Sequence, residues 1–435
     1  MSSEWPLVEI EQVCELIVDC VNKTAPVVAD VTPYRMIRTT NVRRGRIDLG
    51  ECRHVEQATY EKWTRRAKLR PGDVVLTREA PIGEVGLVTE ADGVFLGQRL
   101  MQYRANPRLL DSRFLLYSFL SPFLQQQFGS HEGSGSVVSH IRVGDCFKFK
   151  LALPPLRIQR EIANLLGALD DRITLLRETN ATLEAIAQAL FKSWFVDFDP
   201  VRAKMEGCAP EGMDEATAAL FPDNFEESEF GAVPRGWRVG ALGDILKLRN
   251  ERVQPSELTA SLPYVPIENI STKSPFLQEY KSGQEANSSL VLFKKGDVLF
   301  GAMRPYFHKV CSAPFDGVTR TTVFTLMPVN PSVAAFALFQ AYQDGTVEYA
   351  TQHSEGSTIP YAKWRNSMEL MPITMPPESL QIAYSKVVTS FVERANLNIL
   401  QAQKLATLRD TLLPRLISGQ LRIPEAEAQI EALAA

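Results

Sequence analysis

The chain has 435 residues and a formal net charge of −4. Its composition, with 45% hydrophobic and 23% charged residues, is that of an ordinary globular protein. This length is enough for about three domains, and the composition excludes wholesale disorder, a collagen-like fibre and a disulfide scaffold. The six scattered cysteines have no zinc-ligand spacing, no apolar run reaches the roughly 18 residues of a membrane span, and no signal peptide is evident, so we expect a cytoplasmic protein without membrane contact.

The first feature along the chain is a basic segment. Residues 35–70 contain eleven Lys and Arg against four Asp and Glu, a local net charge of +7. Such a surface can bind a polyanion even when the total charge is near zero. A solvated face that happens to be rich in Arg gives the same pattern, so charge alone supports both interpretations equally.

The first domain is predicted to cover residues 1–153 and to mix strands with helices. Asp73–Thr77 follows a Pro-Gly turn and has the apolar run of a strand, and Gly86–Thr89 is a second strand candidate. Phe114–Leu120 has a helical apolar pattern. A glycine- and serine-rich segment, residues 132–140, follows and is called here the first Gly/Ser loop.

A long helix is predicted for residues 154–200, starting at Pro154-Pro155. Its apolar positions alternate in spacings of four and three residues, which is the heptad pattern of a coiled coil. The seam consists of Leu169, Ile173, Leu176, Asn180, Leu183, Ala187, Leu190 and Trp194. A helix of this length is about 60 Å long, and its seam needs a partner helix. Asn180 either fixes the register of that pairing or is an ordinary tolerated polar residue.

The second half of the chain has the same order of predicted segments. Residues 201–235 are acidic and rich in Pro and Gly, so we predict a linker or surface excursion there. Residues 236–375 are predicted to form a second α+β domain, and residues 376–419 a second long helix. The seam of that helix consists of Val388, Val392, Ala395, Ile399, Ala402, Leu405, Leu408 and Leu412. Residues 420–435 are predicted to be a solvated tail.

The two halves are repeats of one unit. Gly72 and Pro81 correspond to Gly296 and Pro305, in both cases at an offset of 224 residues. Three further pairs follow in the same order at offsets of 223 or 222, namely Gly133 with Gly356, Pro154 with Pro376 and Gln159 with Gln381. We therefore predict an α+β fold with pseudo-two-fold symmetry: two globular domains separated by two long helices that pair antiparallel.

Motifs of catalysis are missing from the sequence. There is no P-loop, and Gly133-Ser-Gly135 lies outside the strand–turn–helix context of a dinucleotide site. Asn330-Pro-Ser lacks the second proline and the aromatic residue of an amino-methyltransferase motif, and the acidic residues 222–228 lack the Lys of a nuclease site. The five histidines have no metal-ligand spacing. We expect a non-catalytic chain that binds no metal and no cofactor.

Two related domains without an active site suit a protein that reads two half-sites on a DNA duplex. In the first domain the candidate DNA-binding residues are Arg43, Arg44, Arg46, Arg78, Arg99, Ser134, Ser136 and His140. In the second domain they are Lys273, Lys294, Lys295, Arg304, Lys309, Ser357, Thr358, Tyr361 and Lys363, several of which belong to the second Gly/Ser loop, residues 355–363. Arg can fork to guanine, whereas most Lys and Arg contacts are made with phosphate. The alternative is that each loop is a plain surface turn, and for any single residue of the loops this alternative is favoured.

Several motifs together resemble the specificity subunit of type I restriction–modification enzymes. They are LPPLRIQREI at residues 153–162, LDDRI at 169–173, LFKSWFVDFDPV at 190–201, Arg304-Pro-Tyr306, and the leucine-rich end of the second helix, residues 405–421. The resemblance covers essentially the whole chain.

The resemblance implies two target-recognition domains, each reading one half of a bipartite DNA sequence, and a helical spacer that docks two methyltransferase subunits. Two restriction–translocase subunits would complete the endonuclease. S-adenosylmethionine, ATP and Mg²⁺ would bind to those partners and not to this chain. Two other functions remain open: a coiled-coil scaffold whose domains bind proteins without recognising DNA, and a self-sufficient nuclease, which the residues support least.

Overall fold

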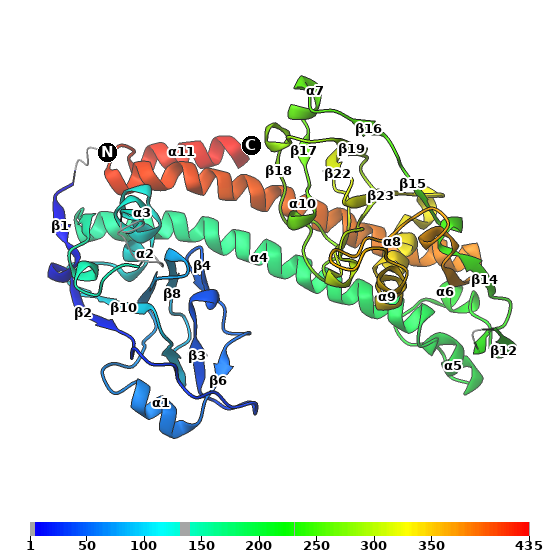
Figure 1. The fold of residues 1–435 in the computed structure, drawn as a ribbon, viewed down its shortest axis with the longest axis horizontal. Coiled ribbons are helices and arrows are strands. Elements are labelled where there is room, and N and C mark those ends of the chain that lie inside the picture. Colours follow the sequence, from blue (N-terminus) through cyan, green and yellow to red (C-terminus); the bar gives the residue numbers. More distant parts are fainter. Residues whose placement is uncertain (1–4, 131–139, 230, 435) are drawn as a thin grey trace. The chain divides into compact units, whose positions relative to one another are not determined.

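The computed structural model describes residues 5–130, 140–229 and 231–434 (Figure 1). The chain divides into two compact units: unit 1 contains residues 1–172 and 405–435, and unit 2 contains residues 173–404. Two helices of 40 and 41 residues, α4 (Leu156–Phe195) and α10 (Glu378–Ser418), each contribute to both units.

Unit 1 is built on a four-stranded antiparallel sheet in the order β2-β10-β7-β8. Its strands are β2 (Cys14–Asp19), β10 (Leu100–Ala105), β7 (Val74–Arg78) and β8 (Ile82–Leu87). A second sheet, β6-β3-β9, contains β6 (Arg53–His54), β3 (Arg35–Ile37) and β9 (Val94–Leu96), and β3 and β9 run parallel. Two strand pairs, β1 (Leu7–Glu9) with β11 (Lys150–Ala152) and β4 (Val42–Arg43) with β5 (Arg46–Ile47), complete the strands.

Helices α2 (Ser112–Leu120) and α3 (Pro122–Gly129) pack on the main sheet of unit 1, and parts of α4 and α10 join the same core. Helix α1 (Gln57–Trp63) packs instead against β9 of the second sheet, and α11 (Ile423–Ala434) packs against the core that contains the end of α10. The helix α2 begins at Asp111, whose carboxylate accepts hydrogen bonds from the backbone of Arg113 and Phe114. One apolar core joins Tyr103 of the sheet, Phe119 of α2, Leu166 of α4 and Leu412 of α10.

Unit 2 repeats this plan. Its main antiparallel sheet has the order β15-β23-β20-β21, with β15 (Leu246–Leu248), β23 (Val323–Pro328), β20 (Val298–Gly301) and β21 (Val310–Ser312). The second sheet is β16-β19-β22-β17-β18, with β16 (Arg252–Val253), β19 (Leu290–Phe293), β22 (Gly317–Arg320), β17 (Pro263–Tyr264) and β18 (Lys281–Ser282). The remaining strand pairs are β14 (Arg238–Ala241) with β24 (Pro372–Met375), and β12 (Phe225–Ser228) with β13 (Gly231–Pro234). The short helices are α5 (Asp199–Met205), α6 (Glu215–Ala219), α7 (Glu257–Ala260), α8 (Ala334–Tyr342) and α9 (Asp344–Gln352).

The correspondence between the units confirms the predicted fold class. The strand order β2-β10-β7-β8 of unit 1 returns as β15-β23-β20-β21 in unit 2. The helix pair α2–α3 returns as α8–α9, and the strand pair β1–β11 returns as β14–β24. Each unit also has one parallel strand pair in its second sheet. The protein is an α+β tandem repeat.

An aspartate of the repeated Gly-Asp motif is buried at the same place in each unit. Asp73 precedes β7 and accepts hydrogen bonds from the backbone N–H of Arg70 (2.7 Å) and from Nε of Arg104 (2.7 Å). Asp297 precedes β20 and accepts from the backbone N–H of Lys294 (2.9 Å) and from Nε of Arg249 (2.7 Å). The carboxylate closes the turn, and the arginine satisfies its charge away from water.

The two long helices pack antiparallel in both units. In unit 1, Arg409 of α10 forms an ion pair with Asp170 of α4 (2.6 Å). In unit 2, the amide of Asn398 donates to Oδ1 of Asn180 (2.8 Å), and the hydroxyl of Tyr384 donates to the carbonyl of Ala187 (3.0 Å). The residue numbers on α10 fall as those on α4 rise, which is the antiparallel order that the sequence predicts.

The predicted seam residues lie along this pairing. Ten are buried: Leu169, Ile173, Leu176, Ala187, Trp194, Val388, Ala395, Ile399, Leu408 and Leu412. Six are partly buried: Asn180, Leu183, Leu190, Val392, Ala402 and Leu405. Asn180 also donates from Nδ2 to the backbone carbonyl of Ala395 (3.1 Å), so both ends of its amide bind α10. The polar seam residue therefore ties one position on α4 to one position on α10.

Two segments differ from the prediction. Residues 201–235 are more than a linker: they contain α6 and the β12–β13 pair, and Phe221 is buried with its ring edge-to-face on Trp194 at 5.3 Å between centroids. Residues 420–435 are not a solvated tail, because α11 buries Ala426 and packs Ile423 and Ile430 against the core of unit 1. In both cases a few apolar residues in a largely polar segment find an apolar surface.

Replacing Asn180 by Leu tests whether the amide pair specifies the helix register. The Asn180→Leu variant leaves the buried amide of Asn398 without its acceptor, so we expect a loss of about 1–3 kcal/mol in the free energy of unfolding, measured in urea. The double variant Asn180→Leu/Asn398→Leu removes both polar groups and should recover most of that loss. Equal destabilisation of the single and double variants would contradict this interpretation.

Candidate nucleic-acid interface

Three of the candidate arginines lie on one tight turn of unit 1. Arg44 and Gly45 join β4 to β5 with positive φ angles of 46° and 87°, the geometry of a two-residue hairpin turn. Glycine is suited to this φ, and the turn leaves the side chains of Arg43, Arg44 and Arg46 exposed. Glu84 accepts hydrogen bonds from the Arg43 guanidinium (3.3 Å) and from the backbone of Arg44 (2.9 Å), which offsets part of the positive charge.

The other described candidates of unit 1 lie around the end of β7, where the backbone N–H of Arg78 donates to the carbonyl of Arg99 (2.8 Å). The Arg78 guanidinium donates to the carbonyl of Ile141 (3.0 Å), directly after exposed His140. Arg99 is half-exposed and forms an ion pair with Glu79 (3.2 Å). Ser134 and Ser136 lie outside the described residues.

The second Gly/Ser loop is closed on itself by backbone hydrogen bonds. Glu355 and Tyr361 exchange two of them, of 3.0 and 2.8 Å. This closure leaves Ser357 and Thr358 exposed at the loop tip. The hydroxyl of Tyr361 donates to the carbonyl of Thr321, so the loop is tied to the strand end next to it. Lys363 is exposed and forms an ion pair with Glu355 (2.6 Å).

Equivalent hydrogen bonds to the main sheet are made by Ile141, just after the first Gly/Ser segment, and by Ala362 of the second Gly/Ser loop. In unit 1 the N–H of Ile141 donates to the carbonyl of Arg78 at the end of β7 (3.0 Å). In unit 2 the N–H of Ala362 donates to the carbonyl of Ala302, directly after β20 (2.9 Å). The strands β7 and β20 are equivalent in the repeat, so Ile141 and Ala362 bind the end of the same strand in each unit.

The remaining candidates of unit 2 have different surroundings. Lys273, Lys294 and Lys295 are exposed, and the first two form ion pairs with Asp344 (4.0 Å) and Asp316 (3.0 Å). Arg304 is half-buried at a positive φ of 51°, and its backbone N–H donates to the carbonyl of Pro360 (2.7 Å).

Lys309 has its ammonium group occupied within the protein. Its Nζ donates to the carbonyls of Ile267 (2.9 Å) and Ile270 (2.8 Å), and burial lowers the pKa of the side chain. A lysine in this position satisfies two backbone acceptors of its own unit. Its contacts therefore favour a structural role over a contact with nucleic acid.

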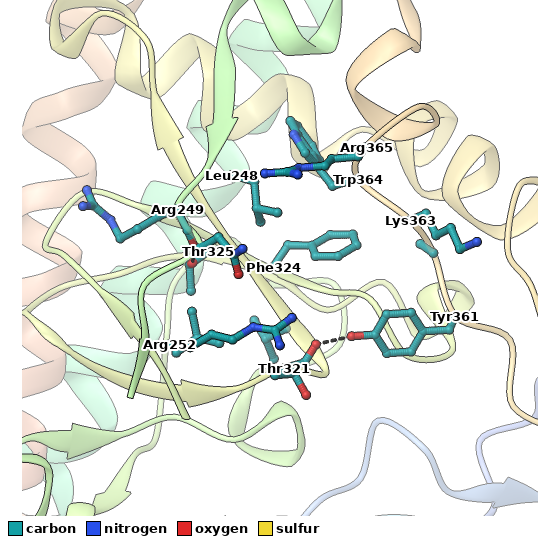
Figure 2. Close-up of a pocket in the computed structure, with 14 residues that line it drawn as sticks. Leu248, Arg249, Arg252, Thr321, Phe324, Thr325, Tyr361, Lys363, Trp364 and Arg365 are labelled. Atoms are coloured by element: carbon teal, nitrogen blue, oxygen red, sulfur yellow. Dashed lines mark hydrogen bonds between the residues drawn. The ribbon is translucent and has the colours of Figure 1, made fainter. Parts of the chain in front are cut away.

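A pocket of about 270 Å³ opens beside the second Gly/Ser loop (Figure 2). Four of its lining residues are basic and three are aromatic, and none is acidic: the basic ones are Arg249, Arg252, Lys363 and Arg365, and the aromatic ones are Phe324, Tyr361 and Trp364. Burial raises the pKa of Tyr361, and the positive charge of Arg252 partly offsets this effect.

The sequence analysis missed Arg249, Arg252 and Arg365. The pocket is assembled from the end of β15, from β16, from β23 and from the residues after the loop, which are far apart in the chain. The only local signal was the basic pair Lys363 and Arg365 at the end of the loop. Basic side chains around an aromatic floor can bind the phosphates and the apolar parts of a nucleic acid.

The described parts of the chain offer no centre for metal chemistry. Within residues 5–130, 140–229 and 231–434, no group of three or more His, Cys, Asp or Glu side chains could hold a metal ion. In the same ranges, no helix is both long and apolar enough to span a bilayer.

Comparison with known proteins gives one consistent result. Residues 2–185 match the family model of the type I restriction modification DNA specificity domain. The chain is 25% identical over 387 residues to the type I restriction enzyme MjaIX specificity subunit of Methanocaldococcus jannaschii, covering 85% of this chain and 83% of the relative. It is 23% identical over 420 residues to the type I restriction enzyme HindI specificity subunit of Haemophilus influenzae, covering 85% and 91% of the two chains.

A solved structure shares the fold. The S subunit of a type I restriction–modification system from M. genitalium superposes with a TM-score of 0.54 at 15% identity, over 95% of this chain and 96% of that one. The likeness extends over both units.

Replacing Lys309 by Met tests its structural assignment. The variant leaves two carbonyls without their donor, so we expect the free energy of unfolding to fall by about 1–3 kcal/mol. The matched change Lys294→Met, at an exposed ion pair, should alter stability by no more than about 0.5 kcal/mol. If Lys309→Met left stability unchanged and instead weakened DNA binding, the assignment would be wrong.

Proposed function

We propose that this chain, which belongs to the family of type I restriction–modification specificity subunits, recognises DNA sequence with both of its α+β units. Each unit would read one half of a bipartite target, and the chain itself would be non-catalytic. The observation that carries the proposal is the repeated hydrogen bond by which Ile141, after the first Gly/Ser segment, and Ala362, in the second Gly/Ser loop, bind the end of equivalent strands, β7 and β20.

The surroundings of these loops support nucleic acid as the ligand. In unit 1 Ile141, which follows the Gly/Ser segment, binds the Arg78 guanidinium, and the β4–β5 turn of the same unit exposes three arginines. In unit 2 the loop borders a pocket with four basic side chains and no acidic one. Arg and Lys side chains of this kind bind phosphates and fork to guanine. The same residues would recognise a protein partner only if it were strongly acidic.

The long helices are the proposed docking site for two methyltransferase subunits. Some of their apolar side chains are exposed instead of lying in the seam: on α4, Leu175 and Ile186 are 51% and 43% exposed, and on α10, Leu397 is 61% exposed. Leu175 and Ile186 are eleven residues apart, about three turns, so they lie on one face of the helix. Exposed apolar residues on one face favour a protein partner.

The chemistry of modification and restriction is proposed to belong to partner subunits. The methyltransferase subunits would bind S-adenosylmethionine, and two restriction–translocase subunits would bind ATP and Mg²⁺. This chain would select the site at which they act. A scaffold that joins the same partners without recognising DNA is the alternative, and the exposed apolar residues of α4 and α10 alone do not distinguish the two.

DNA retention at increasing salt separates the two functions. We expect the full chain with its methyltransferase subunits to bind duplex DNA, with log K falling linearly with log salt because counterions are released from the phosphates. Several phosphate contacts give a slope of several units, about −0.9 for each contact. Binding that is absent, or that does not depend on salt, would support the scaffold.

Exchanging one domain tests whether the two units read independently. Each unit has its own apolar core, so residues 1–153 can be replaced by the matching segment of the HindI specificity subunit without altering the core of unit 2. We expect the sequence that the complex methylates to change in one half only, as seen by mapping methylated adenines. A change in both halves would show that recognition is shared between the units.

A further inference from the structure

The floor of the pocket in unit 2 is the ring of Phe324, which packs against three other aromatic rings. Phe324 of β23 stacks on Phe300 with 6.3 Å between centroids and an interplanar angle of 22°. Tyr361 and Trp364 meet the same ring edge-on, at 6.4 and 6.3 Å. Figure 2 shows Arg252 and Arg365 on opposite sides of Phe324. The floor is therefore rigid and apolar, with a guanidinium on either side.

Two of the four basic residues carry charge that is already neutralised. Arg249 forms ion pairs with Asp297 (2.7 Å) and Glu251 (2.9 Å). Lys363 forms one with Glu355 (2.6 Å).

Arg252 and Arg365 differ from Arg249 and Lys363 in having no acidic partner among the described residues. Both are exposed, and neither side chain forms an ion pair or hydrogen bond with the part of the chain that the structure describes. The lining contains no acidic residue to compensate them. The pocket thus presents two unpaired guanidinium groups to an incoming anion, and guanidinium binds phosphate strongly through paired N–H donors.

The shape of the site selects the part of DNA that can enter it. The base edges of a duplex lie at the bottom of its grooves, so a protein reads them with an element that protrudes. The sugar–phosphate backbone is the convex part of the duplex and can enter a hollow. Its phosphate would meet the two guanidinium groups, and the apolar side of a deoxyribose would meet Phe324.

We propose that this pocket clamps a phosphodiester group of the DNA backbone between Arg252 and Arg365. This inference rests on the proposed function and assigns these two arginines to positioning, because phosphate contacts fix register and orientation without reading sequence. The wall of the pocket continues through Tyr361 into the second Gly/Ser loop. A backbone held in the pocket would bring Ser357 and Thr358 at the loop tip against the neighbouring groove.

The test uses the full chain in complex with its methyltransferase subunits. The variant Arg252→Ala/Arg365→Ala is compared with wild type on two duplexes of equal length, one carrying the methylated sequence and one of random sequence. Both affinities should fall by a similar factor, about 10- to 100-fold. The slope of log K against log salt should become shallower by about one unit. The DNA sequence that the complex methylates should stay the same.

Two further variants separate phosphate binding from base reading and from net charge. Arg252→Lys/Arg365→Lys should recover most of the affinity, since a phosphate accepts a point charge where a guanine needs the fork of arginine. Arg235→Ala/Arg238→Ala removes two exposed arginines of the same unit that already pair with Asp223 and Asp244. This control should bind both duplexes almost as wild type does.

Several results would overturn the clamp. A changed methylated sequence, or a loss confined to the specific duplex, would make the arginines base readers. Unchanged binding of both duplexes would place the pocket off the DNA path, and if inorganic phosphate alone then stabilised the wild type but not the double Ala variant, the pocket would be a site for small anions. A wild-type complex that bound neither duplex would refute the proposed function itself, and the clamp with it.

Discussion

The structure depends on the burial of one apolar seam between α4 and α10. Each helix alone would expose a row of Leu, Ile and Val to water, and each such side chain contributes about 1.5–3 kcal/mol when it is fully buried. The seam belongs to the cores of both units: Leu169 and Leu412 pack in unit 1, and Ala187 and Val388 pack in unit 2. The fold of either unit therefore requires that the other half of the chain supplies its helix.

A second constraint acts within each unit and explains why the repeat is recognisable. The buried Asp73 and Asp297 close equivalent turns before equivalent strands. Their charged partners are not equivalent, however: Arg104 comes from β10, whereas Arg249 follows β15. The physical requirement is that the buried carboxylate has a guanidinium partner, which comes from the adjacent strand in unit 1 and from the end of the next strand but one in unit 2.

The features that were predictable from sequence are those with a local signal. The heptad spacing around Leu169 depends only on helix geometry, and the repeated Gly-Asp turn can be aligned by eye. The pocket was not predictable, because Arg252 and Arg365 line one cavity only after two distant segments have folded together. Composition also does not show whether the ammonium group of a lysine is free, so the sequence predicts Lys309 as a candidate DNA-binding residue, whereas in the fold two backbone carbonyls accept its ammonium group.

The same reasoning explains why residues 201–235 and 420–435 differ from the prediction. Residues 205–230 are strongly acidic, and two aromatic residues, Phe221 on Trp194 and Phe225 on Phe198, pack part of this stretch against unit 2. In the last segment, Ile423, Ala426 and Ile430 are spaced three and four residues apart, which is a helical stripe too short to be decisive by itself. Burial of a few residues depends on the surface available to them, which only the folded chain provides.

The central claim is that one doubled chain directs modification to a two-part DNA sequence. It is tested most directly by sequencing, with methylation detection, the DNA of cells that express this chain with its methyltransferase subunits and of cells that lack the chain. The account predicts adenine methylation, dependent on the chain, at two short specified blocks separated by a gap of constant length without sequence preference. Methylation at a single uninterrupted block, or the same methylation without the chain, would contradict it.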